Sequence, residues 1–234
     1  MLFDNMQEII SIPGFSDPFS SMTHLFAATF FLLLGVRLIA SSPVRGAKNV
    51  SLYVFVFSVV FLLSMSGVFH LLSPNSSGRE VLQRLDHAAI FILIAGSFTP
   101  THILLFKGWQ RWLVLVFVWL AAITSITLKT IFFHEMPEWF SLILYLGLGW
   151  VGTLSAYLIH HHQYRGLNRF LALGALAYTV GAVLEFSRYP VVVAGVIGSH
   201  EIFHLFVIAG ISMHWWMVLR VARLSAGQNH GKIK

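Results

Sequence analysis

The stretch VSLYVFVFSVVFLLSMSGVFHLL, residues 50–72, carries no Asp, Glu, Lys or Arg along its whole length. About 20 consecutive apolar residues are enough for a helix to cross the hydrocarbon core of a bilayer. The stretch therefore predicts a transmembrane helix. Its last two turns also contain two polar residues, Ser66 and His70, which lie four residues apart.

Six other runs share this apolar character, and charges or turn residues separate them. We place the seven runs at 20–40, 50–72, 87–106, 112–131, 139–160, 168–186 and 201–221. The sequence thus predicts an all-α membrane protein with a seven-transmembrane-helix bundle over residues 20–222. We expect an N-terminal tail at 1–19, with a segment suited to the membrane interface, and a basic C-terminal tail at 223–234.

The composition supports this interpretation. Hydrophobic residues make up 57% of the chain and charged residues 10%, whereas average soluble domains are about a quarter charged. An ordinary cytosolic enzyme, a disordered chain and a nucleic-acid-binding protein are therefore excluded. The absence of cysteine excludes disulfides and thiolate metal sites. The net charge of +6 fits membrane orientation and attraction to anionic lipid.

The distribution of Lys and Arg predicts the orientation. With seven spans the two tails face opposite sides of the membrane. The N-terminal side holds four basic residues and the C-terminal side holds the other eleven. Because loops rich in Lys and Arg stay in the cytoplasm, we expect the N-terminus outside and the C-terminus in the cytoplasm.

Polar residues near the ends of three runs are the candidate functional residues. An Asp at the centre of a membrane helix costs about 2.5–3.5 kcal/mol on insertion scales, so such residues point to function. Ser66 and His70 share one helix face, as do His200 and His204, because each pair is four residues apart. Asp86 stands at the start of the third run.

Successive spans cross the membrane in opposite directions, so the position of a span in the count (its parity) fixes which side each of its ends faces. The end of the second run and the starts of the third and seventh lie on one side of the membrane. Two histidines four residues apart plus a third ligand are typical of a catalytic zinc site with one open position. Ser66 and Glu201 are candidate hydrogen-bond partners of the ligands. The alternative is that the histidines make only helix–helix hydrogen bonds.

Three stretches carry a family resemblance: SGVFH at 66–70, LDHAAIFILIAGSFTP at 85–100 and GSHEIFHLF at 198–206. With them, residues 20–221 resemble the hemolysin III branch of the progestin and adipoQ receptor (PAQR) family, which is related to adiponectin receptors and alkaline ceramidases. The resemblance implies a seven-helix bundle with zinc between the helices. Bacterial members carry the hemolysin name, which implies a bacterial plasma membrane protein and a link to cytolysis.

The resemblance also implies roles for individual residues. His70, His200 and His204 would bind zinc directly, Asp86 would contact the metal through water, and Ser66 would lie behind the ligands. The implied activity is ceramidase-like hydrolysis of lipid amides in membrane lipid homeostasis, with Asp86 and Ser66 as catalytic residues and a lipid substrate in the bundle core. A lipid sensor with structural zinc and a transporter or cytolytic pore remain alternatives.

Two departures from the family pattern matter. The acidic-and-Asn motif ahead of the first span is not evident, and only Thr23-His24 remains, so we expect no inherited functional residue before Thr23. Animal adiponectin receptors are held to have a cytoplasmic N-terminus, against the charge count. Outside the site, we expect His24 to be a packing contact and Glu185 to pair with Arg188.

Overall fold

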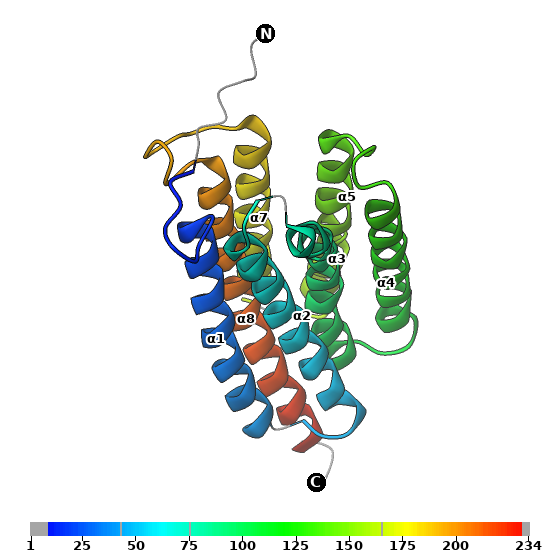
Figure 1. Cartoon of the computed structure of the whole chain (residues 1–234). Helices are drawn as coiled ribbons and strands as arrows, with labels where there is room; N and C mark the ends of the chain where they lie inside the picture. The colour runs from blue at the N-terminus through cyan, green and yellow to red at the C-terminus, as the bar shows by residue number, and fades with distance from the viewer. Residues whose placement is uncertain (1–8, 43, 75, 165, 231–234) are drawn as a thin grey trace.

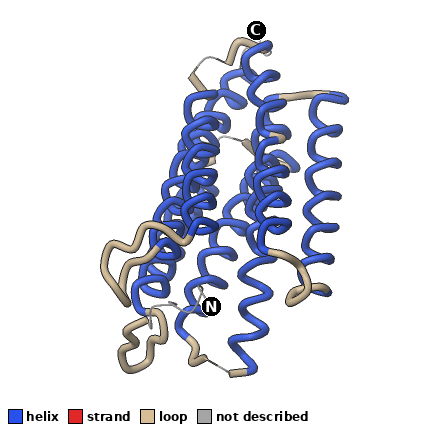
Figure 2. Tube along the Cα trace, turned by 90° about the horizontal axis from the view of Figure 1, so that it is seen from above, coloured by secondary structure: helices blue, strands red, loops and turns tan. Residues whose placement is uncertain are grey.

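A computed structural model describes residues 9–42, 44–74, 76–164 and 166–230. This part of the chain consists of helices joined by loops (Figure 2). The helices are α1 (Pro18–Ala40), α2 (Ala47–Leu71), α3 (Ser77–Leu105), α4 (Gly108–Ile131), α5 (Glu138–Trp150), α6 (Gly152–His161), α7 (Asn168–Ser187) and α8 (Ser199–His230). Residues 1–8 of the expected N-terminal tail and 231–234 of the expected C-terminal tail lie outside the described residues.

The described residues form seven helices long and apolar enough to cross a membrane. Helices α5 and α6 together make the fifth, Glu138–His161. The helix is interrupted at Val151, in a segment that also contains Gly147, Gly149 and Gly152. Glycine weakens a helix by about 1 kcal/mol relative to alanine. The predicted all-α, seven-span membrane protein is confirmed, with one span divided in two.

Two helices, α3 and α8, extend far beyond the predicted apolar runs, whereas the ends of the others lie closer to them. Helix α3 begins at Ser77 rather than near residue 87, because the Ser76 side chain caps it by accepting a hydrogen bond from the Arg79 amide at 3.2 Å. Helix α8 continues past residue 222 to His230. There Ser225 is buried and accepts a hydrogen bond from Lys48. An apolar run marks the membrane-embedded part of a helix, whereas caps and packing contacts fix its ends.

The bundle has two apolar cores. The larger lies among α1, α2, α3 and α8 and includes Phe55, Leu63, Ile211 and Trp215. The smaller lies among α3, α4 and α5 and includes Phe91 and other buried side chains. Figure 1 shows α4 and α5 on the side of the bundle away from α1. Helix α3 therefore belongs to both cores.

Candidate metal centre

Three histidines from two helices converge near one end of the bundle. His70 lies in the last turn of α2, and His200 and His204 lie in the first turns of α8. One ligand atom of each lies within 4.8 Å of the others. The Nε2 atoms of His70 and His200 are 3.1 Å apart. In a tetrahedral site with metal–nitrogen bonds of about 2.0–2.1 Å, two ligand nitrogens lie about 3.3 Å apart. The three imidazoles, which we call the histidine cluster, therefore fit a metal ion.

A carboxylate from the segment before α1 orients His70. The Nδ1 atom of His70 lies 2.7 Å from Oδ2 of Asp17, which also accepts a hydrogen bond from Arg79 at 2.8 Å. The amide of Asp17 donates to the carbonyl of His70 at 2.9 Å. Burial alone would raise the pKa of Asp17, but the hydrogen bonds from His70 and Arg79 lower this pKa below its usual value. Asp17 is therefore a carboxylate that directs Nε2 of His70 towards the other two histidines of the cluster.

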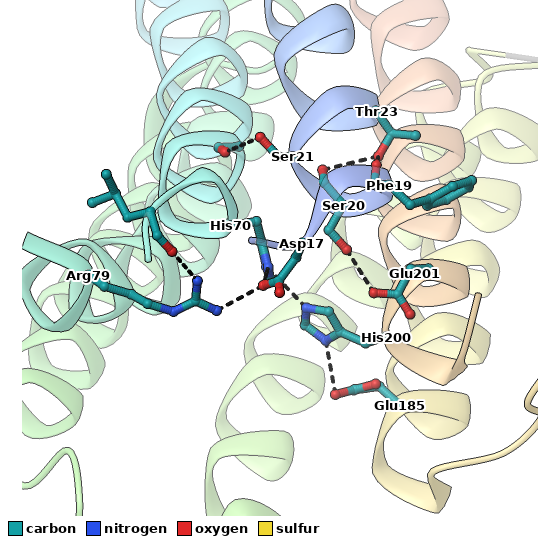
Figure 3. Close-up of polar contacts among 12 residues, drawn as sticks. Asp17, Phe19, Ser20, Ser21, Thr23, His70, Arg79, Glu185, His200 and Glu201 are labelled. Carbon is teal, nitrogen blue, oxygen red and sulfur yellow. Dashed lines mark hydrogen bonds and ion pairs between the residues drawn. The ribbon is translucent and has the colours of Figure 1, made fainter. Parts of the chain in front are cut away.

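A second carboxylate orients His200. Oε1 of Glu185, near the end of α7, lies 3.1 Å from Nδ1 of His200, and Oε2 accepts a hydrogen bond from Ser199. Figure 3 shows the resulting line of contacts from Arg79 through Asp17, His70 and His200 to Glu185.

The expected pairing of Glu185 with Arg188 is wrong. The guanidinium of Arg188 instead binds Glu138 of α5 at 2.8 Å. Arg188 caps α7 in a left-handed conformation with φ of 53°, which ends the helix beyond Glu185. Glu185 is therefore left to the polar groups at the start of α8.

The third histidine is the most deeply buried. The ring of His204 stacks on that of His24 with centroids 4.0 Å apart. Neither nitrogen of His24 nor Nδ1 of His204 has a hydrogen-bond partner of good geometry among the described residues. An unpaired buried polar group costs about 1–3 kcal/mol. The backbone of His204 approaches His24 and that of Ser20 approaches His204, so the protein satisfies these nitrogens only in part.

Close packing of α1 on α2 holds His24 at this position. A Cβ added at Gly67 would lie 2.7 Å from Cγ of Leu25, the residue after His24. The carbonyl of Gly67 also accepts a hydrogen bond from Ser21 at 2.8 Å. The small residue Gly67, in the SGVFH stretch, thus lets the backbones of α1 and α2 approach each other, as is common between membrane helices.

Among the described residues, the hydrogen bonds of Glu201 go to groups other than the three histidines, contrary to its candidate role. Its carboxylate accepts hydrogen bonds from Ser20 of α1 and from the amide of Gly198, both at 2.9 Å. Residues adjacent on a helix point in directions about 100° apart, so Glu201 faces α1 while His200 faces the cluster. Its contacts fasten the start of α8 to α1.

Ser66 and Asp86 line a cavity of about 670 Å³ together with His24, His200 and His204. Ser66 lies one turn before His70 and is buried, and Asp86 is half-buried. Asp86 is not part of the histidine cluster. Away from the cluster the wall is mainly apolar and includes Leu93, Leu171, Ala175 and Val207. The cavity thus joins a polar end at the cluster to an apolar interior.

The model of the Haemolysin-III related family matches residues 15–215, from just before Asp17 into α8. The chain belongs to this family. It is 26% identical over 203 residues to Hemolysin-3 of Bacillus cereus, covering 86% of this chain and 89% of the relative. It is 29% identical over 171 residues to a Hemolysin-3 homolog of Bacillus subtilis, covering 73% and 76%. Identity to a rice (Oryza sativa subsp. japonica) heptahelical transmembrane protein, ADIPOR3, is 29% over 199 residues, covering 76% and 48%. The family resemblance seen in the sequence is confirmed.

The two carboxylates that orient the histidines, Asp17 and Glu185, are not predicted by the sequence analysis of this family member. Asp17 precedes the first span and Glu185 ends the sixth, so parity places both at the same membrane face as the histidines. That signal was available in the sequence. No motif distinguishes these acids from ordinary interfacial ones. The expectation of no inherited functional residue before Thr23 overlooks Asp17, which contacts His70 directly.

Proposed function

We propose that this Haemolysin-III family member is a zinc-dependent hydrolase of lipid amides or esters that acts within the membrane. The observation that carries the proposal is the opening of the histidine cluster onto a cavity with a polar end and an apolar interior. A lipid has the matching chemistry, since it joins a polar group to a long apolar chain. Turnover of such lipids would contribute to membrane lipid homeostasis.

His70, His200 and His204 would hold the metal, with Asp17 and Glu185 accepting the Nδ1–H groups of His70 and His200. Imidazole ligands suit zinc, and three protein ligands leave one position open. When bound, zinc lowers the pKa of water to about 7 and polarises a carbonyl group.

The remaining chemistry belongs to residues on the cavity wall. The Asp86 carboxylate would orient the attacking water and accept its proton. The Ser66 hydroxyl, on the same helix face as His70, would donate a hydrogen bond to the substrate at the polar end. The apolar wall would hold an acyl chain and limit access of bulk water.

We further propose a location in a bacterial plasma membrane, as the Bacillus relatives suggest, with the N-terminus outside. This orientation places the histidine cluster near the outer face. The chain has no cysteine, so single cysteines report orientation directly. On intact cells, a membrane-impermeant thiol reagent should label a Ser73→Cys variant and leave Ser41→Cys unlabelled; the reverse pattern would overturn this orientation.

The test of the proposed activity uses purified, zinc-loaded protein in lipid nanodiscs, offered ceramides, other N-acyl lipids and lipid esters. We expect turnover by the wild type and its loss in Asp86→Asn, with metal content unchanged in the variant. Zinc-loaded, folded wild type that cleaves none of these lipids would contradict the hydrolase proposal. In that case a structural metal in a lipid sensor becomes the better explanation.

A further inference from the structure

Two polar rings on facing helices form a reciprocal pair in the middle of the bundle. Tyr178 of α7 packs over Gly210 of α8, where an added Cβ would lie 2.5 Å from Cε1 of the tyrosine. His214 of α8 packs over Gly174 of α7, where an added Cβ would lie 2.5 Å from Nε2 of the histidine. Each helix thus supplies a glycine and, four residues later, a ring. The ring centroids are 5.4 Å apart.

The polar atoms of this pair are buried and unpartnered. Among the described residues, neither the Tyr178 hydroxyl nor either ring nitrogen of His214 has a hydrogen-bond partner of good geometry. The backbone of Leu171 approaches His214 as a weaker partner. Both side chains line the cavity that opens at the histidine cluster. An unpaired polar group in the membrane interior is strongly unfavourable. A polar group inside the cavity would give these atoms the well-formed hydrogen bonds that the protein does not supply.

The position of the pair limits what that group can be. Ten residues separate His204 from His214 on α8, which corresponds to about 15 Å along the helix. The cavity wall between them includes the apolar side chains Val207, Leu171 and Ala175. A molecule that reaches both ends needs a polar end, an apolar chain and a second polar group deep in the chain.

The chemistry of the pair selects an uncharged hydroxyl as that second group. A hydroxyl both donates and accepts hydrogen bonds, as do a phenol and a neutral imidazole. Away from the histidine cluster and His24, the other unpartnered atoms on the cavity wall belong to Thr101, Tyr145 and Asn168. Among these unpartnered side chains of the cavity wall, the phenol of Tyr178 and the imidazole of His214 are in ring contact.

We propose that Tyr178 and His214 bind a hydroxyl group on the chain of a lipid in the cavity, so that the protein prefers lipids hydroxylated deep in the chain. The inference rests on the proposed function only in placing the polar end of a lipid at the histidine cluster. Water is the competing occupant. A water molecule would satisfy the same atoms but would give no preference between hydroxylated and plain chains.

The experiment compares binding of three fatty acids to the full-length, zinc-loaded protein in nanodiscs. The probes are octadecanoate, 2-hydroxyoctadecanoate and 12-hydroxyoctadecanoate, measured in competition with one fluorescent fatty acid. An extended chain carries the hydroxyl of the 12-hydroxy compound to about the depth of the pair. We expect this compound to bind about three- to tenfold more tightly than the other two, the effect of one net hydrogen bond.

Two matched variants locate the effect. Tyr178→Phe removes the phenol hydroxyl and keeps the ring over Gly210, so it should abolish the preference while octadecanoate affinity stays unchanged. Tyr145→Phe removes another unpartnered hydroxyl from the cavity wall and should keep the preference. Equal binding of all three probes by the wild type, or a preference that survives Tyr178→Phe, would overturn the inference. Because the readout is binding, the preference can hold even if no lipid is hydrolysed, and hydrolysis can occur without it.

Discussion

Asp17 and His70 are 53 residues apart in the chain, yet Oδ2 of Asp17 lies 2.7 Å from Nδ1 of His70. The contact ties the segment before α1 to the end of α2 and fixes which nitrogen of His70 faces the cluster. Metal-binding histidines generally donate their second N–H to such an acceptor, and loss of the acceptor weakens metal binding about 10- to 100-fold.

Replacing Asp17 with Asn should therefore weaken zinc binding by a factor of about 10 to 100 without unfolding the protein. Zinc affinity can be measured by competition with a chromogenic chelator. Glu80→Gln is the matched control, because Glu80 is an exposed acid in the first turn of α3. Equal affinities for Asp17→Asn and Glu80→Gln would refute the role given to Asp17.

Glu185→Gln should also weaken zinc binding, because it removes the acceptor beside Nδ1 of His200. We expect a smaller loss than for Asp17, nearer the lower end of about tenfold, since Glu185 is partly exposed and its contact is longer. Arg188→Gln should leave zinc affinity unchanged because Arg188 binds Glu138. A loss of affinity in Arg188→Gln as large as that in Glu185→Gln would instead support the pairing expected from sequence.

Gly67→Val should separate α1 from α2 and displace His24 from His204. Overpacking of this kind typically destabilises by about 1–3 kcal/mol, which a lowered melting temperature and a reduced zinc affinity would reveal. In contrast, an added Cβ at Gly147 of α5 meets nothing within 4 Å. Gly147→Ala should be neutral or stabilising. Similar losses in both variants would show that the effect is not specific to the α1–α2 contact.

Ser66→Ala should reduce the turnover proposed above while leaving zinc content intact, because Ser66 lines the cavity and is not part of the histidine cluster. Loss of one hydrogen-bond donor to the transition state lowers turnover about 10²- to 10³-fold. Ser64→Ala is the control, because Ser64 is a half-buried serine of α2 that does not line the cavity. Equal turnover by Ser66→Ala and Ser64→Ala would show that Ser66 is not a catalytic residue.

The sequence predicted the convergence of the histidines because parity depends only on the number of spans. His70, His200 and His204 lie at run ends that any seven-span bundle places on one side. The role of Asp17 was not predictable in this way, since it depends on a non-helical segment whose amide pairs with the carbonyl of His70. Loop contacts of this kind follow no periodic pattern of residues that could be recognised in the sequence.

The second limit on prediction from the sequence is the direction in which a side chain points from its helix. His200 and Glu201 are neighbours in the sequence, but one faces the cluster and the other faces Ser20 of α1. The choice between them depends on the rotation of α8 about its axis, and the apolar residues on every side of this helix do not reveal that rotation in the sequence. The ring-over-glycine pair of Tyr178 and His214 likewise required the register of α7 against α8.

The most direct test of the central claim is the zinc content of the purified protein by elemental analysis. It compares the wild type with His70→Ala and with His200→Ala/His204→Ala, each confirmed to be folded. The account predicts about one zinc per wild-type chain and its loss from both variants. A folded wild type that remains without zinc after zinc loading, or variants that retain it, would contradict the account.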